Sequence, residues 1–396
     1  MRVLIAGAGI GGLTTALCCL QRGHEVILFE QAQALTEVGA GIQLPPNAMR
    51  VFQALGVADQ IAAHAFVPKA LEARMGRSGR RLFRLPLAKR VEKNWRAPYL
   101  HIHRADYISA LTKALLVLAP RALHLGAQVL RYAEAGSSVA VELSDGETVT
   151  GDLLVAADGI HSTIRAQLAG AEQPRFTGHV AWRAVVPIEQ LGKYLPPPTA
   201  CVWMGRGKHA VTYRLRRGTL ANFVGVVECS EWGKESWSEQ GSRDQALADF
   251  SDWHSLVPGL IAAADTLYRW ALFDRAPLHN WVQGRVALLG DAAHPMLPFM
   301  AQGAAMAVED AWIIAAALGE QNRTVTDSLL AYQRARHARA TAVQGAAAAN
   351  ASRFHQRSVA GQLMTYGPMW LAGHVLPSLI HQRTNWLYQY DVTAAV

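Results

Sequence analysis

Hydrophobic and polar positions in the first 30 residues form blocks that predict a strand, a helix and a second strand. Residues 3–6 are a short aliphatic run, and the glycine-rich stretch 7–12 interrupts it. Residues 13–20 suit a buried helix that ends at Gly23, and residues 25–29 form a second buried-strand run. Such a unit is typical of the start of a parallel α/β domain.

Further apolar runs continue this pattern up to about residue 175, and turn signals such as Asp145-Gly146 and Asp158-Gly159 separate them. We expect these elements to complete the first part of one α/β domain. They are a helix that Asn47 caps and that ends near Gly56, a helix headed by Asp106 that reaches about residue 118, a strand pair at 139–149 and a buried strand at 153–157.

The pattern changes between residues 176 and 275, where short strand-like runs follow one another with little helix between them. This arrangement predicts an antiparallel sheet. A buried-strand run at 286–289 and an alanine-rich helix at 303–318 return to the α/β type, and helical composition continues to about residue 349. We therefore expect an α/β fold with a Rossmann-like domain that a second, antiparallel domain interrupts: 1–175 and 276–340 for the first domain, 176–275 for the sheet, and 341–396 for C-terminal helices.

Composition excludes a disordered chain and gives little support for a nucleic-acid partner. Of the 396 residues, 51% are hydrophobic and 17% are charged, so the chain can bury enough apolar surface to fold. The formal net charge is +8, but no run of five or six like charges occurs. Solubility is the simpler explanation of this charge, and the alternative is a field that attracts small anions such as carboxylates or phosphorylated cofactors.

Cysteine usage and the apolar stretches predict a cytoplasmic protein that does not enter a membrane. None of the four cysteines has the C-x-x-C spacing of a redox dithiol or a zinc site. The strand–helix unit explains the apolar N-terminus better than a signal peptide does. The apolar stretch at 363–380 is interrupted by glycine, proline and histidine, which favours a packed pair of terminal helices over a membrane span.

The glycine-rich turn matches a dinucleotide fingerprint. Gly7-x-Gly9-x-x-Gly12 follows a predicted strand, opens a helix and precedes Glu30 at the end of the next strand. The glycines allow a tight turn and a close approach to a pyrophosphate, while Glu30 can accept hydrogen bonds from ribose hydroxyls. The alternative is that the glycines only allow close packing. An acid at this position favours FAD or NAD over a nucleotide with a ribose 2′-phosphate.

A second glycine–acid pair helps to distinguish FAD from NAD. Gly290 and Asp291 lie at the carboxyl end of a predicted strand, where open sheets bind ligands. Asp291 could bind ribityl hydroxyls there, although the segment taken alone could equally be a strand-end turn and helix cap. The chain also lacks the Tyr-x-x-x-Lys of one large class of dehydrogenases.

Three motifs in the same order resemble the single-component FAD-dependent aromatic hydroxylases, the family of p-hydroxybenzoate and salicylate hydroxylases. They are the fingerprint with Glu30, the segment 157–165 that contains Asp158-Gly159, and the segment 290–295. Shorter stretches at 39–43, 46–47, 103–106 and 300–303 are similar to the branch of salicylate, 3-hydroxybenzoate and 6-hydroxynicotinate hydroxylases. Together the motifs span most of the chain.

The resemblance implies a bound FAD and assigns residues to it. Arg104 approaches the pyrophosphate, Gln43 lies beside the flavin or the ribityl chain, and Asp291 binds the ribityl group. Asp158 and Gly159 belong to the same cofactor set. The backbone of Ala301, Gln302 and Gly303 lies near the flavin pyrimidine, where amides at a helix start would stabilise an anionic reduced flavin. No metal is expected, because His101-x-His103 fits packing or flavin-side residues better than ligands.

The implied reaction hydroxylates a small phenolic or hydroxylated aromatic acid. NADH or NADPH reduces the FAD, O2 is trapped as a flavin C4a-hydroperoxide, and the distal oxygen passes to the ring. Because this transfer is electrophilic, the substrate hydroxyl has to be deprotonated or strongly hydrogen-bonded.

The catalytic residues follow from the same resemblance. Relatives carry a His-x-x-x-Tyr in the substrate sheet, which implies that His209 activates the hydroxyl and that Tyr213 orients the substrate. The alternative is that His209 is only a histidine at the start of a strand and that Tyr213 is only a core tyrosine. Pro295 resembles the family proline near the hydroperoxide, whose surroundings stabilise it.

The stretch 296–299 departs from the family pattern. Some relatives place Gln or His there, whereas this chain has Met, Leu, Pro and Phe. An apolar pocket roof disfavours a heteroaromatic substrate that needs a polar partner. Arg183 and Arg214 are weaker candidates for meeting a substrate carboxylate.

Two other classes remain as alternatives. A reductase or halogenase could use the same fold, but the chain lacks the W-x-W-x-I-P segment of halogenases. A non-enzymatic escort protein could have lost its flavin, which the intact Gly290-Asp291 pair argues against.

Overall fold

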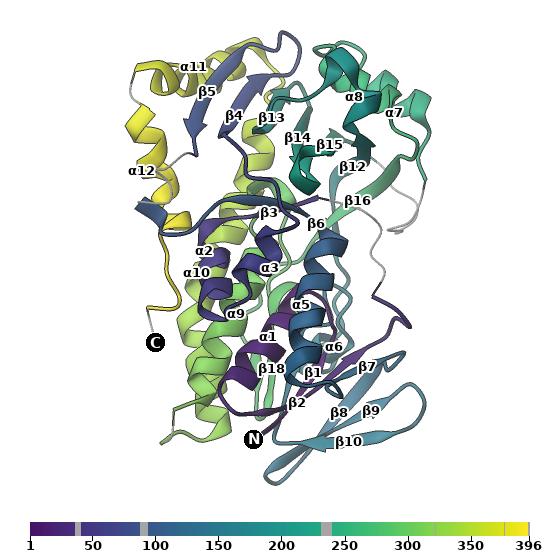
Figure 1. Ribbon diagram of the computed structural model, residues 1–396, viewed down its shortest axis with the longest axis vertical. Helices are drawn as coiled ribbons and strands as arrows, with labels where there is room; N and C mark the ends of the chain where they lie inside the picture. Colours follow the sequence, from purple (N-terminus) through teal and green to yellow (C-terminus); the bar gives the residue numbers. More distant parts are fainter. Residues whose placement is uncertain (36–40, 88–93, 231–239, 321, 376, 395–396) are drawn as a thin grey trace.

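The computed structural model describes residues 1–35, 41–87, 94–230, 240–320, 322–375 and 377–394, and two large sheets dominate it (Figure 1). The first sheet has the strand order β17-β18-β11-β1-β2-β7. All neighbouring strands in it are parallel except β17, which runs antiparallel to β18. The strands are β1 (Arg2–Ala6), β2 (Glu25–Glu30), β7 (Leu123–Leu125), β11 (Leu153–Ala156), β17 (Val282–Gln283) and β18 (Val286–Leu288).

The helices beside this sheet also pack against one another. Helix α1 (Ile10–Gln21) packs against both α5 (Arg104–Leu118) and α9 (Gly303–Leu318), and α9 packs against α10 (Val325–Phe354). The first helix ends where Gly23 takes a positive φ of 78°, a conformation that costs glycine little. The apolar residues of β1, β11, α1 and α9 form the main core.

Shorter elements surround this domain. A three-stranded sheet consists of β8 (Val129–Ala135), β9 (Ser138–Leu143) and β10 (Thr148–Gly151), and a two-stranded sheet consists of β3 (Gly41–Leu44) and β6 (Leu100–His103). The short helices are α2 (Pro46–Ala54), α3 (Ala58–Ala62) and α6 (Thr163–Ala169).

The predicted cap at Asn47 is wrong. Helix α2 begins at Pro46, and Pro45 occupies the N-cap position. Proline suits the first turn because it lacks the amide that would need a partner there. Asn47 lies inside the helix, and its buried side chain reaches α9 instead.

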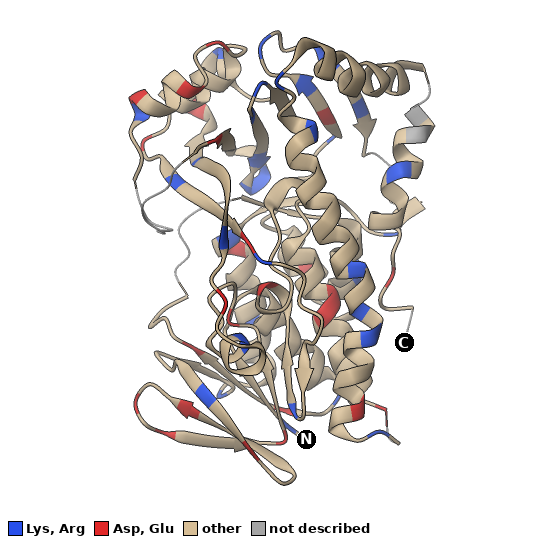
Figure 2. Cartoon of the chain, turned by 180° about the vertical axis from the view of Figure 1, so that it is seen from behind, with Lys and Arg blue, Asp and Glu red and all other residues tan. Residues whose placement is uncertain are grey.

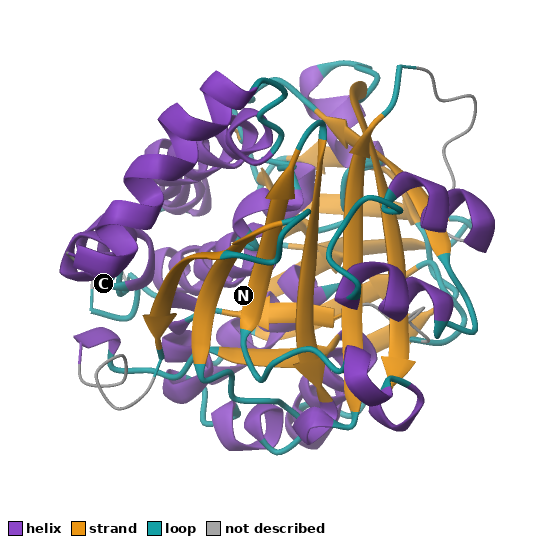
Figure 3. Cartoon of the chain, turned by 90° about the horizontal axis from the view of Figure 1, so that it is seen from above, coloured by secondary structure: helices purple, strands orange, loops and turns teal. Residues whose placement is uncertain are grey.

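The second large sheet has the strand order β16-β12-β15-β14-β13-β4-β5. Figure 3 shows strands of a large sheet side by side. Helices α7 (Arg243–Asp249) and α8 (Leu256–Ala262) cover one face, over a core that includes Trp182 and Phe250. The other face packs against Leu297 and Phe299, from the loop that follows β18. The strands are β4 (Ala70–Met75), β5 (Arg81–Pro86), β12 (Arg175–Pro187), β13 (Ala200–Gly205), β14 (Lys208–Leu215), β15 (Leu220–Glu228) and β16 (Tyr268–Asp274).

Two of these strands lie outside the segment that the sequence assigned to the sheet. Strands β4 and β5 come from residues 70–86, and β4 pairs parallel with β13. The remaining neighbours in the sheet are antiparallel. Helix α10 likewise runs through the boundary drawn between residues 340 and 341. The division into linear segments was therefore too simple at these two places.

The chain ends in two helices that contact each other, α11 (Val359–Val375) and α12 (Pro377–Tyr388), as the sequence predicted. Across the described residues, no helix has both the length and the apolar character needed to cross a membrane. Basic and acidic residues are interspersed along the ribbon (Figure 2).

Candidate functional site

The first turn shows two different requirements for glycine. A Cβ on Gly7, whose φ is 95°, would lie 2.5 Å from the carbonyl oxygen of Ala157. A Cβ on Gly12 would lie 1.8 Å from the carbonyl oxygen of Gly7. Both glycines are therefore needed for the turn itself. A Cβ on Gly9, at the N-cap of α1, would meet no atom within 4 Å, so this position leaves open space at the helix N-terminus.

Glu30 lies beside this turn at the end of β2. Its Oε2 accepts a hydrogen bond of 2.8 Å from the Ala8 amide, and its Oε1 accepts one of 3.0 Å from the Ala32 amide. These bonds fix the carboxylate next to the glycine turn. Each oxygen keeps a further lone pair with which it could accept from a ribose hydroxyl.

Asp158 and Gly159 follow β11 at the same edge of the sheet. Gly159 takes a φ of 79°, which favours glycine, and burial raises the pKa of Asp158. Arg165, a few residues further on, donates bonds of 2.9 and 3.0 Å to the carbonyl oxygens of Ala292 and Ala293. The segment after β11 is thereby tied to the segment after β18.

Asp291 lies just beyond the carboxyl end of β18. Its side chain is open to solvent, yet the surrounding protein raises its pKa, while the charges of His294 and Arg104 act in the opposite direction. Arg104, the first residue of α5, is thus close enough to interact electrostatically with Asp291. Gly290 has a φ of 60°, and a Cβ there would lie 3.0 Å from the Cβ of Ala307, so glycine allows α9 to approach.

The chain turns sharply before α9 begins. Ala301 adopts a left-handed conformation with a φ of 51°, and Gly303 is the first residue of α9. Gln302 is buried, and its Oε1 accepts a bond of 3.2 Å from Asn47. Its Nε2 is buried with no hydrogen-bond partner among the described residues. This unsatisfied donor and the helix N-terminus suit a ligand that offers acceptor atoms.

Gln43 lies on β3, opposite His101 on β6. Its Oε1 accepts a hydrogen bond of 2.5 Å from the Tyr99 hydroxyl. His101 is fully buried, stacks on Phe66, and has a pKa that burial lowers to about 3. Residues 39 and 40 of the motif that ends at Gln43 lie outside the described residues.

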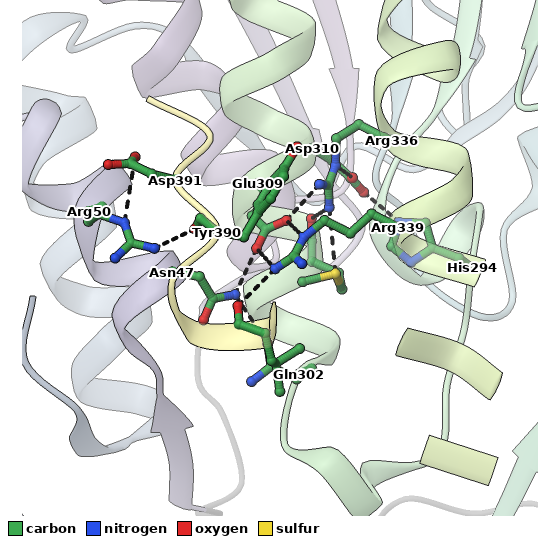
Figure 4. Close-up of polar contacts among 12 residues, drawn as sticks. Asn47, Arg50, His294, Gln302, Glu309, Asp310, Arg336, Arg339, Tyr390 and Asp391 are labelled. Carbon is green, nitrogen blue, oxygen red and sulfur yellow. Dashed lines mark hydrogen bonds and ion pairs between the residues drawn. The ribbon is translucent and has the colours of Figure 1, made fainter. Parts of the chain in front are cut away.

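A network of buried hydrogen bonds and ion pairs connects α2, α9 and α10 near the turn that precedes α9 (Figure 4). His294 Nε2 lies 2.5 Å from Asp310, which also accepts a bond of 2.7 Å from Arg336. Arg336 and Arg339 both donate to Glu309, at 2.6 and 2.7 Å. Asn47 donates to the same Glu309 at 2.7 Å.

The sequence reasoning missed this network. An adjacent acid pair inside an alanine-rich helix, and two arginines three residues apart in the next helix, were the signals that could have revealed it.

Pro295 belongs to a loop that α10 holds in place. Its carbonyl oxygen accepts a bond of 2.8 Å from Gln344, and the carbonyl oxygen of Phe299 accepts one of 3.1 Å from Asn350. Both amide side chains come from α10. The loop therefore has a fixed position against the second sheet.

His209 lies on β14 and faces this loop. Its ring packs edge-on against Phe299 at 4.9 Å between centroids, and it is buried. Its Nδ1 lies 2.6 Å from Nε2 of His355, a residue that the sequence did not point to. Burial and the neighbouring histidines lower the pKa of His209 well below its usual range, so the ring is neutral.

Tyr213 lies four residues further along β14 and contacts the two-stranded sheet. Its ring is 4.6 Å from that of His101, and a Cβ on Gly41 would collide with it. Burial raises the pKa of Tyr213, while the positive charge of Arg183 lowers it. The two predicted catalytic side chains thus lie at opposite ends of one strand face, His209 at the Phe299 loop and Tyr213 at Gly41.

Arg183 is better placed than the sequence suggested. Burial lowers its pKa to about 10, its guanidinium lies 4.4 Å from the centre of the Trp270 ring, and its Nε has no hydrogen-bond partner among the described residues. Arg214 instead donates a bond of 2.9 Å to the carbonyl oxygen of Pro196. Of the two arginines, Arg183 is the one that shares the surroundings of Tyr213.

Comparison with known proteins shows what this chain is similar to as a whole. Residues 1–347 match the family described as FAD binding domain. A 3-hydroxybenzoate 6-hydroxylase of Aquipseudomonas alcaligenes is 38% identical over 98% of this chain and 97% of its own length. A 3-amino-4-hydroxybenzoate 2-monooxygenase of Streptomyces platensis is 36% identical over 89% of this chain and 88% of its own.

A solved structure shares the fold. The substrate complex of a salicylate hydroxylase superposes with a TM-score of 0.84 and 28% identity, over all of this chain and 96% of the other. The predicted fold class, a Rossmann-like α/β domain with an antiparallel sheet and C-terminal helices, is confirmed.

Proposed function

The chain belongs to the FAD binding domain family, within its branch of aromatic hydroxylases, and from this premise we propose that it is an FAD-dependent monooxygenase that hydroxylates a phenolic aromatic acid with NAD(P)H and O2. The observation that carries the proposal is the near full-length similarity to a hydroxybenzoate hydroxylase, and the glycine turn beside Glu30 supports it. A reductase, a halogenase or an escort protein has no comparable support.

The residues of the candidate site fit FAD. Gly9 leaves open space at the N-terminus of α1 for a pyrophosphate, and Glu30 is fixed beside it for the ribose. Asp291 and Arg104 interact electrostatically, and they would supply the acceptor and the cation that ribityl hydroxyls and phosphate need. Gln43, Asp158 and Gly159, the pair Gly290-Asp291, and the backbone of 301–303 complete the cofactor set that we propose. FAD, when bound and reduced by NADH or NADPH, supplies the chemistry that activates O2 for transfer to the substrate ring.

The substrate side is formed by the second sheet and the loop at 295–300. We assign His209 as the base that accepts the substrate hydroxyl proton, because its ring is neutral and buried. Tyr213 orients the substrate, and the cation of Arg183 meets its carboxylate. Pro295 and Phe299 keep water away from the reacting ring.

The proposal extends to partners and location. The partners are a small aromatic substrate and O2, without nucleic acid. The location is the cytoplasm, which supplies NAD(P)H, and this agrees with four cysteines that form no disulfide among the described residues.

A substrate panel tests the proposal. The purified protein should carry or take up FAD and turn yellow. Hydroxylated benzoates and hydroxypyridines are then screened for stimulated NADH and NADPH oxidation, and the product is identified after a reaction in 18O2. Incorporation of one labelled oxygen atom into a phenolic acid is the expected result. A protein that stays colourless with added FAD, or one that no phenolic compound stimulates, would contradict the proposed function.

A further inference from the structure

His355 is held against His209 by contacts that come from a distant part of the chain. It follows α10 directly, and its carbonyl oxygen accepts a bond of 3.4 Å from the Gly207 amide in the turn between β13 and β14. Arg206 in the same turn donates to the carbonyl oxygen of Arg357. The end of α10 is therefore fastened to the strand that carries His209.

Three side chains form a continuous line from His209 to the surface. His209 Nδ1 lies 2.6 Å from His355 Nε2, and His355 Nδ1 lies 3.3 Å from Glu228 Oε1. The two histidines are only 2% and 4% exposed, whereas the Glu228 side chain at the end of β15 is 26% exposed. The line thus begins in the core and ends at a carboxylate that solvent reaches.

The carboxylate dictates where the ring protons lie. An ionised Glu228 only accepts, so His355 carries its hydrogen on Nδ1 and presents a bare Nε2. That Nε2 accepts from His209, which must then carry its hydrogen on Nδ1. His209 is left with a bare Nε2, the state that a base requires.

We propose that His355 and Glu228 form a proton relay that carries the substrate hydroxyl proton from His209 to solvent. The relay rests on the proposed function, in which His209 accepts that proton on Nε2. As His209 accepts it, its Nδ1 hydrogen passes to His355 Nε2, and the Nδ1 hydrogen of His355 passes to Glu228. Glu228 then releases one proton to water, so one proton enters the line and one leaves, and no oxidant or reductant is needed.

The surroundings of His209 and His355 favour passing the proton on, and they disfavour a ring that keeps it. Burial and the charge of His179 lower the pKa of His355, as they do for His209, so a proton does not rest on either ring. Arg357 forms an ion pair with Glu228 at the outer end of the line. His179 lies close to His355, with 5.2 Å between ring centroids.

These same groups include metal-ligand types, since the donor atoms of His179, Glu228 and His355 lie within 4.8 Å of one another. Two observations favour the relay over a metal site. Arg357 already forms an ion pair with Glu228, and the second ring nitrogen of His355 contacts His209 at 2.6 Å, a contact that the relay requires and a metal site does not.

Proton release on substrate binding tests the relay without turnover. The FAD-loaded enzyme is mixed with 3-hydroxybenzoate, and in parallel with salicylate, in weakly buffered solution with a pH indicator. For His355→Ala we expect proton release at least ~10-fold slower than in the wild type, with an unchanged flavin spectrum and with recovery on addition of free imidazole. Glu228→Gln should slow release similarly, because the amide cannot take up the proton.

A matched control is Glu142→Gln. Glu142 is a partly exposed glutamate that accepts a bond of 2.8 Å from Arg131 on the small sheet, and its replacement should leave proton release unchanged. Unchanged release in both relay variants would overturn the proposal. Slowed release in His355→Ala without recovery by imidazole, together with normal release in Glu228→Gln, would show a packing role and overturn it as well.

Two more measurements test the assigned base and the metal site separately from the relay. If His209→Ala releases the proton as the wild type does, the base assigned in the proposed function is wrong; if only the His209 variant is slow, the base stands and the relay fails. Dialysis of the wild type against EDTA should change nothing. Loss of proton release that zinc restores would instead show a metal site and overturn the relay.

Discussion

At the scale of single residues, the three fingerprint glycines are not equivalent. Gly12 has no room for a side chain, because a Cβ would overlap the Gly7 carbonyl oxygen, and Gly9 has room that the protein itself does not use. The sequence motif does not distinguish Gly9 from Gly12. The structure separates a glycine that the fold needs from one that the cofactor needs.

This difference predicts opposite behaviour for two alanine variants. Gly9→Ala should leave the melting temperature of the FAD-free protein unchanged and weaken FAD binding by roughly 10-fold or more, equal to about 1.4 kcal/mol, because the new methyl group occupies the space of the pyrophosphate. Gly12→Ala should destabilise the FAD-free protein itself by at least ~1–3 kcal/mol. Melting curves and FAD titrations measure both. Equal melting temperatures for the two variants would contradict this assignment.

Some residues of the site could be predicted from the sequence, and others could not. Glu30 and Asp291 follow glycine motifs at strand ends, where the chain order alone predicts a shared crevice. His355 belongs to no motif and reaches His209 only because α10 ends beside the turn at Gly207. Such a contact depends on the length and direction of a helix, and local patterns do not encode it.

At the scale of elements, the buried ion pairs join α9 to α10. Arg336 is fully buried and bonds both Glu309 and Asp310, and Arg339 supplies a second cation to Glu309. His294 attaches the loop of Asp291 to the same Asp310. The network thus positions the cofactor turn relative to these two core helices.

Removal of Arg336 should therefore lower the free energy of unfolding. Arg336→Met removes the arginine from the buried Asp310 and leaves the buried Glu309 with Arg339 alone, and we expect a loss of about 3–5 kcal/mol in the free energy of unfolding. The control is Arg323→Met, since Arg323 pairs with an exposed glutamate, Glu320, and such pairs contribute about 0–1 kcal/mol. Urea unfolding of both variants measures the difference. Similar midpoints would show that the buried network adds no more than a surface pair.

Some strands could be predicted from the sequence and others could not. Strands with alternating or fully apolar runs, such as β1, β11 and β14, were found because their pattern matches burial. Strands β4 and β5 were missed, since both mix charged and apolar residues, and β4 joins the sheet through β13, more than 120 residues away. Pairing over that distance is a property of the whole fold.

At the scale of the whole molecule, several histidines are buried in the neutral form. Burial lowers the pKa of His101 to about 3 and also lowers the pKa of His209, His179 and His355. In the unfolded chain a histidine has a pKa near 6.5, so below that pH the unfolded state binds protons that the folded state excludes. The stability that these residues allow is complete above pH 6.5 and is lost as the pH falls towards the folded pKa values.

His101 is the residue on which to test this, because it lies apart from the coupled histidines around His209. One histidine with a folded pKa of about 3 lowers the free energy of unfolding by about 2 kcal/mol between pH 7 and pH 5. Replacement by phenylalanine, which can still pack against Phe66 and Tyr213, should remove that part of the pH dependence. The carboxyls of Asp158 and Asp291, whose pKa values are raised, act in the opposite direction. Because they are present in both proteins, they cancel in the difference between the wild type and His101→Phe. Urea midpoints measured from pH 7 to pH 5 should therefore fall less steeply in the variant, and parallel curves would show that His101 is already protonated in the folded protein or is reached by water.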